Sequence, residues 1–105
     1  MQSTPVERSL FVLILTYVKP LSEVDRLLAP HKIYLERNYK AGHFLTSGRQ
    51  EPRIGGVILA QAESKERINA IITEDPFLTE GVAEYQVVEF HPSQAASGLE
   101  RLLSQ

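Results

Sequence analysis

The sequence contains no cysteine, and this absence excludes several kinds of chemistry. Disulfides, thiolate nucleophiles and cysteine-based zinc sites all require that residue. A chain without cysteine suits a reducing compartment, so we expect a cytoplasmic protein.

An excess of positive charge is also absent, because eleven lysines and arginines stand against thirteen aspartates and glutamates. Binding to nucleic acid or to an anionic membrane surface calls for a basic patch, which this balance does not indicate. The apolar run "LFVLILTYV" at 10–18 is too short to cross a bilayer as a helix. We therefore predict neither a nucleic-acid partner nor membrane association.

What is present is the composition of an ordinary globular protein, with 43% hydrophobic and 23% charged residues in a chain of 105. This length is sufficient for one hydrophobic core and too short for two domains. We predict a single domain over residues 1–105, with a flexible polar start at 1–7 and a short C-terminal helix at 93–105.

Hydrophobic spacing predicts the other elements. Runs rich in β-branched and aromatic residues predict strands at 8–17, 43–50, 56–61 and 83–90. Helical spacing predicts a helix begun by Ser22 and a second helix from Pro30 to about Ala41, closed by Gly42. A third helix is capped by Ser64 and stopped at Asp75. The order βαββαβ predicts an α+β, ferredoxin-like sandwich with a four-stranded antiparallel sheet.

The first of these strands is apolar on both faces. Its two rows are Leu10, Val12 and Ile14 on one side and Phe11, Leu13 and Leu15 on the other. Each apolar face must be buried against another part of the protein or against a partner chain. Both helices of a ferredoxin-like fold lie on the same face, so the opposite face needs a partner, most economically a second copy packed sheet to sheet. We therefore predict a homodimer.

Three stretches of the sequence resemble the YCII-related family of small dimeric α+β barrel proteins. They are "PHKIYLERNYKAG" at 30–42, "LTSG" at 45–48, and "EDPF" at 74–77, which is followed by Gly81 and "EYQVVEF". The resemblance covers nearly the whole chain and implies a dimeric α+β barrel. It also implies that His31 and Asp75 form an acid/base pair, and that Ser47, Gly48 and Phe77 contact the substrate.

The chemistry of His31 and Asp75 fits this role. The first turn of a helix disfavours a charged imidazole, so His31 would be held neutral and able to take a proton. If Asp75 reaches the other ring nitrogen, it fixes the tautomer, and the stop at Pro76 would serve to place that carboxylate. The alternative is that His31 caps its own helix or bonds a loop while Asp75 merely precedes a turn.

Two classes of function remain open at this point. The first is an acid/base enzyme, a lyase, dehydrochlorinase or isomerase-like protein acting on a small cyclic or aromatic metabolite, as the resemblance implies. The second is a non-catalytic homodimeric module that binds a metabolite or a partner protein. An RNA-binding role is less well supported, because the exposed aromatics and positive charge that it needs are missing.

No metal site and no cofactor are expected. His43 and His91 fall at predicted strand ends, and their spacing from His31 matches no metal-binding motif.

Overall fold

The structure, a computed structural model, describes residues 8–103. Its elements are β1 (Ser9–Tyr17), α1 (Leu21–Arg26), α2 (Leu28–Lys40), β2 (Phe44–Arg49), β3 (Gly55–Ala62), α3 (Lys65–Ile72), α4 (Pro76–Thr79), β4 (Ala83–Phe90) and a 3-10 turn, η1 (Glu100–Leu102). The flexibility predicted for residues 1–7 concerns a segment outside the described residues. Within residues 8–103, no helix is both long enough and apolar enough to cross a membrane.

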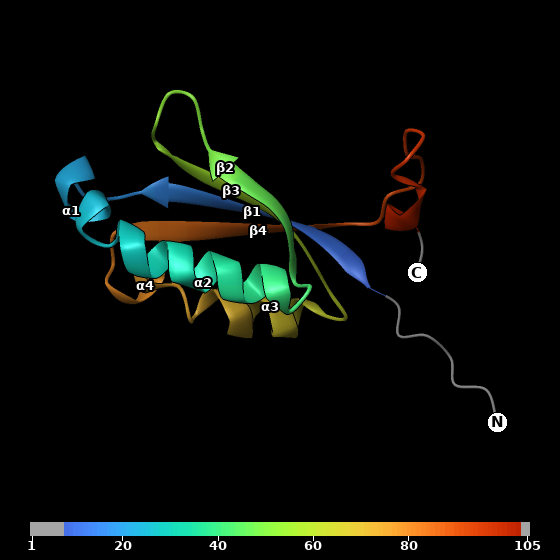
Figure 1. Cartoon of the computed structure of the whole chain (residues 1–105), viewed down its shortest axis with the longest axis horizontal. Coiled ribbons are helices and arrows are strands. Elements are labelled where there is room, and N and C mark those ends of the chain that lie inside the picture. The colour runs from blue at the N-terminus through green and yellow to red at the C-terminus, as the bar shows by residue number, and fades with distance from the viewer. Residues whose placement is uncertain (1–7, 104–105) are drawn as a thin grey trace.

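The four strands form one antiparallel sheet in the order β2-β3-β1-β4. Helices α2, α3 and α4 all lie on one side of this sheet (Figure 1). The predicted α+β, ferredoxin-like sandwich is therefore confirmed. Every strand agrees with its predicted range to within one residue at each end, because the strands carry a clear apolar pattern bounded by turn residues.

The core lies between the sheet and the helices. Phe11 and Leu13 of β1 are buried there and belong to one apolar cluster with Tyr34 of α2. Val12 and Ile14 alternate with them, point to the opposite face and are only partly buried. The strand is apolar on both faces, as the sequence indicated, and the helices cover only the row that contains Phe11.

The helix boundaries correct two predictions. α2 begins at Leu28 and not at Pro30, because a proline in the first turn removes an N–H that has no partner within the helix. α1 has Pro20 as its N-cap and no side-chain cap, so the cap expected at Ser22 is wrong. Gly42 does end α2, because its φ of +82° lies in the left-handed region that favours glycine.

The helix predicted at 93–105 is replaced, among the described residues, by the short turn η1. This segment lies beyond the end of the sheet, away from the sandwich (Figure 1). Leu99, part of the leucine pattern on which the helix was predicted, is 49% exposed. A short helix is marginal in water unless an apolar face packs against the core, and Leu99, Leu102 and Leu103 do not belong to the core cluster.

Candidate functional site

Asp75 lies in the short connection between α3 and α4. α3 ends at Ile72, and Asp75 is the N-cap of α4, where one side-chain oxygen, Oδ1, accepts the N–H of Phe77 at 2.9 Å. Pro76 occupies the first helical position of α4, where its fixed φ suits a helix start. The sequence interpretation of Pro76 as the stop of the preceding helix is therefore wrong: the proline opens a new helix, and Asp75 caps it.

His31 and Asp75 meet although 44 positions separate them. His31 is the fourth residue of α2, and its Nδ1 lies 2.8 Å from Oδ1 of Asp75. Asp75 has no exposed surface and His31 is 8% exposed. Burying a carboxylate destabilises the fold unless hydrogen bonds replace the water that it loses. The hydrogen bond with His31 is therefore part of what allows Asp75 to be buried.

Tyr85 of β4 completes the hydrogen bonding of Asp75 by donating its hydroxyl to Oδ2 at 2.5 Å. Burial raises the pKa of Tyr85, as do the neighbouring Tyr34 and the Asp75 carboxylate, so Tyr85 remains a neutral donor. Asp75 then accepts from the Phe77 N–H, from Tyr85 and from His31. An ionised carboxylate only accepts, so Nδ1 of His31 must carry a hydrogen, and Nε2 is the unprotonated nitrogen of the neutral ring.

Phe77 fixes the plane of the His31 ring. The two rings stack with centroids 3.9 Å apart and planes within 5° of each other. One residue of α4 therefore supplies the backbone N–H that binds Asp75 and the ring that covers His31. The imidazole is held at Nδ1 and on one face, and Nε2 has no hydrogen-bond partner among the residues that the structure describes.

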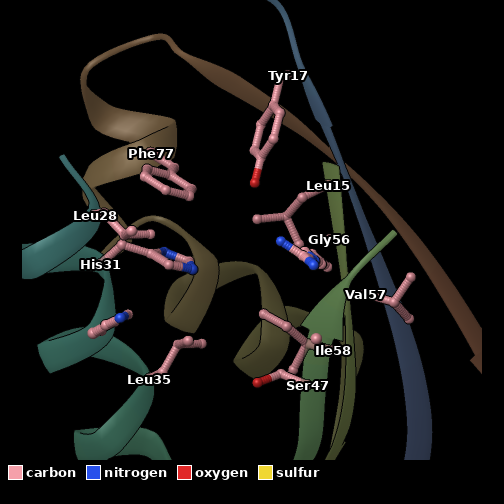
Figure 2. A pocket seen from close by; sticks show the side chains of 13 residues that line it. Leu15, Tyr17, Leu28, His31, Leu35, Ser47, Gly56, Val57, Ile58 and Phe77 are labelled. Atoms are coloured by element: carbon pink, nitrogen blue, oxygen red, sulfur yellow. The ribbon is translucent and has the colours of Figure 1, made fainter. Parts of the chain in front are cut away.

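A cavity of about 270 Å³ opens beside this ring, between α2 and the strands β1, β2 and β3. In Figure 2, His31 and Phe77 form one wall and Ser47, Gly56 and Ile58 the facing wall, with the Tyr17 hydroxyl directed toward the space between them. The described lining residues are Leu15, Tyr17, Leu28, His31, Lys32, Leu35, Ser47, Gly48, Arg49, Gly56, Val57, Ile58 and Phe77. The cavity suits one small ring rather than a drug-sized ligand, because such ligands need about 300–1,000 Å³.

The five residues singled out from the sequence therefore lie in one region. His31, Ser47, Gly48 and Phe77 line the cavity, and Asp75 lies behind His31. The Ser47 hydroxyl already makes a short hydrogen bond with the Tyr39 hydroxyl, so the two groups form a polar pair on the β2 side.

Several residues of the site were not found from the sequence. Tyr85 was one of four tyrosines with nothing to distinguish it. Arg49 had a usable signal, because it lies two residues after Ser47 on one strand and so shares its face. Lys32 directly follows His31, so its position in the sequence could also have indicated that it lies near the site.

The other histidines take no part in this arrangement. Nδ1 of His43 lies 2.9 Å from Oδ1 of Asn38, and partial burial together with nearby arginines lowers the pKa of His43. The side chain of His91 is 78% exposed, with Nε2 4.0 Å from Glu89. Among residues 8–103, no group of three or more His, Asp or Glu side chains is placed to hold a metal ion.

The sheet topology defines a small α+β protein of ferredoxin-like fold, and the paired side chains of His31 and Asp75 lie beside its cavity. The model of the YCII-related domain matches residues 10–91, and the chain belongs to that family. A search of curated proteins gives no significant match.

The solved structures that resemble the chain include the following two. The first is 5-chloro-2-hydroxyhydroquinone dehydrochlorinase (TftG) from Burkholderia phenoliruptrix AC1100, in complex with 2,5-dihydroxybenzoquinone. It is 21% identical, with a TM-score of 0.68 over 79% of this chain and 95% of that chain. The second is a variant of SnoaB, a cofactor-independent oxygenase from Streptomyces nogalater, which is 14% identical, with a TM-score of 0.49 over 89% of this chain and 99% of that chain. The first supports the fold assignment.

The buried tyrosines predict how stability depends on pH. Burial raises the pKa of Tyr34 and of Tyr85 above the ordinary value near 10, so the folded chain resists losing these protons. The resulting stabilisation is complete below about pH 10 and is lost as the pH rises beyond it. We expect the free energy of unfolding, measured in urea, to fall from about pH 10 upward.

The variant Tyr85→Phe tests the contribution of one of these two tyrosines. It should be about 1–3 kcal/mol less stable at neutral pH, because Oδ2 of Asp75 loses its donor. Its stability should then decline less steeply above about pH 10, because one raised tyrosine pKa is gone. If the stability of Tyr85→Phe fell as steeply above about pH 10 as that of the wild-type protein, the raised pKa assigned to Tyr85 would be contradicted.

Proposed function

We propose that the protein is an acid/base enzyme, of the lyase, dehydrochlorinase or isomerase-like kind, which acts on a small cyclic or aromatic metabolite. The observation that carries the proposal is the hydrogen bond between His31 and Asp75 at the wall of a mostly apolar cavity. A neutral imidazole with Nδ1 bound and Nε2 facing an open space is a competent general base. The dehydrochlorinase of similar fold supports the choice of reaction class by analogy.

In this mechanism Nε2 of His31 takes a proton from the bound ring compound. Asp75 stabilises the imidazolium that forms, and it is ready to do so because its carboxylate is already oriented by Tyr85 and by the Phe77 N–H. Phe77 prevents the ring from tilting while the proton moves. The Ser47 hydroxyl and the Gly48 backbone, both on β2, contact the ligand from the opposite wall.

The proton transfer serves either of two outcomes. In an elimination, the electron pair released to the ring expels a leaving group such as chloride, and the products are the dehydrochlorinated ring, chloride and the proton on His31. In an isomerisation, the imidazolium returns the proton to another atom of the same ring. Both use the same base and need no change in its position.

Variants of the pair test the proposal with chloride release from 5-chloro-2-hydroxyhydroquinone as the assay. We expect His31→Ala to reduce the rate at least about 100-fold, the usual contribution of a positioned base. Asp75→Asn should also lower it, and the double variant should be no slower than His31→Ala, because residues that act as a unit are non-additive. Circular dichroism checks that each variant is folded.

His43→Ala is the matched control, because His43 lies outside the cavity lining and should leave the rate unchanged. Full activity in His31→Ala would contradict the catalytic role. A ring ligand that binds the wild-type protein but is never turned over would favour the non-catalytic binding module.

We further propose that the protein is a homodimer packed through the helix-free face of its sheet. The apolar side chains on this face include Val12, Ile14, Val57, Leu59 and Val88, which adjoin one another in the strand register. Val57 and Val88 are exposed. An uncovered apolar face on a central sheet favours burial against a second copy.

The dimer is tested by sedimentation equilibrium at micromolar concentration, where twice the mass of one chain is expected. Ile14→Lys places a charge in the middle of the proposed interface and should yield a monomer. Ile33→Lys, on the exposed side of α2, adds the same charge outside the interface and should leave the mass unchanged. A wild-type monomer would contradict the proposal.

A further inference from the structure

The charged side chains that line the cavity all have one sign. Lys32 of α2 and Arg49 of β2 are the cations among the described lining residues, and no carboxylate is among them. The nearest carboxylate described above, Asp75, is covered by His31 and has its oxygens occupied by three donors. The cavity therefore presents positive charge to whatever enters it.

These two cations also differ from three arginines that have carboxylate partners. Arg26 pairs with Glu23 at 3.3 Å, Arg37 with Glu74 at 3.5 Å, and Arg53 with Asp25 at 2.6 Å. Lys32 and Arg49 form no ion pair with any residue that the structure describes. Their charges are available to a ligand.

The two cations come from opposite walls of the cavity. Lys32 adjoins His31 on α2, and Arg49 shares a face of β2 with Ser47, where it lies opposite Gly56 of β3. A ligand between α2 and the sheet would therefore have a cation on each side. The rest of the wall is largely apolar, including Leu15, Leu28, Leu35 and Ile58.

We propose that the cavity binds a single planar ring that carries an anionic oxygen, either a ring carboxylate or an ionised ring hydroxyl, and that Lys32 and Arg49 bind that oxygen substituent. The proposal rests on the proposed function, because it names the class of substrate for the same site. The ring lies among the leucines and Ile58, and its reacting atom faces His31. Arginine matches carboxylate geometry through two parallel N–H donors, whereas lysine provides a mobile point charge.

The same cations would assist the reaction. When His31 removes a proton from the ring compound, negative charge is left on the ligand, and in a ring with oxygen substituents that charge spreads onto oxygen. Lys32 and Arg49 are exposed side chains at the cavity wall, and cations placed beside this oxygen stabilise its charge by electrostatic attraction. Lys32 and Arg49 would therefore act on binding and on rate together.

The experiment compares two ligands that share one ring, 2,5-dihydroxybenzoate and its uncharged methyl ester, by NMR titration of the full chain. Chemical-shift changes at His31 and at the cavity residues report binding in the site. We expect the carboxylate to bind at least about tenfold more tightly than the neutral ester in low salt, and this preference should diminish as salt is added. In a parallel arm, 2,5-dihydroxybenzoquinone, whose ring hydroxyls are ionised at neutral pH, tests the hydroxyl source of the charge.

Variants assign the preference to the two cations. Lys32→Gln and Arg49→Gln should each weaken binding of the carboxylate about fivefold or more, while binding of the ester changes less than twofold. Lys40→Gln removes the same charge from the other end of α2, outside the cavity, and should leave both affinities unchanged.

The outcomes separate this inference from the proposed function. Equal binding of the carboxylate and the ester beside His31 would overturn the anion preference and leave the acid/base proposal intact. Loss of the preference in Lys40→Gln as large as in Lys32→Gln would show a general charge effect and would also overturn it. Absence of shifts at His31 with all three ligands would overturn both proposals.

Discussion

The buried carboxylate of Asp75 is the constraint on which the site depends. It has no exposed surface and accepts hydrogen bonds from three separate elements: His31 of α2, the Phe77 N–H of α4 and Tyr85 of β4. A buried charge without its partners is strongly destabilising, so these elements can pack only in the arrangement that supplies all three donors. The same bonds that stabilise the carboxylate orient the imidazole. The hydrogen bonds that form when the chain folds therefore also orient His31 for proton transfer.

The cavity exists because the sheet carries small residues where it faces the beginning of α2. Ser47, Gly48 and Gly56 lie there, whereas deeper in the core Phe11 and Tyr34 fill the space between sheet and helices. A Cβ atom on Gly56 would lie 3.2 Å from the backbone oxygen of Gly48, so position 56 is tightly packed. The result is a space bounded on one side by backbone and small side chains and on the other by the paired imidazole.

The fold was predictable from the sequence because each strand has a clear apolar pattern and the order of elements restricts the topology. The two ends of the site, His31 and Asp75, were found through the resemblance to a family, since no local pattern shows that residues 44 positions apart will meet. Tyr85 could not be identified from the sequence, because its hydrogen bond joins β4 to Asp75 in the connection between α3 and α4, and no local pattern predicts that contact. Pro76 was misread because a proline marks the end of one helix and the start of another equally well. The prediction of a C-terminal helix was wrong for a different reason. Its leucines have helical spacing, but nothing in the sequence indicates whether they pack against the core.

The hydrogen position on the His31 ring is the most direct test of how Asp75 prepares this site. Long-range ¹H–¹⁵N spectra of the neutral ring distinguish a protonated nitrogen from an unprotonated one. The geometry requires Nδ1 to carry the hydrogen, because Asp75 accepts at that position, and Nε2 to be unprotonated toward the cavity. Observation of the opposite tautomer, or of an even mixture of the two, would contradict the role assigned to Asp75.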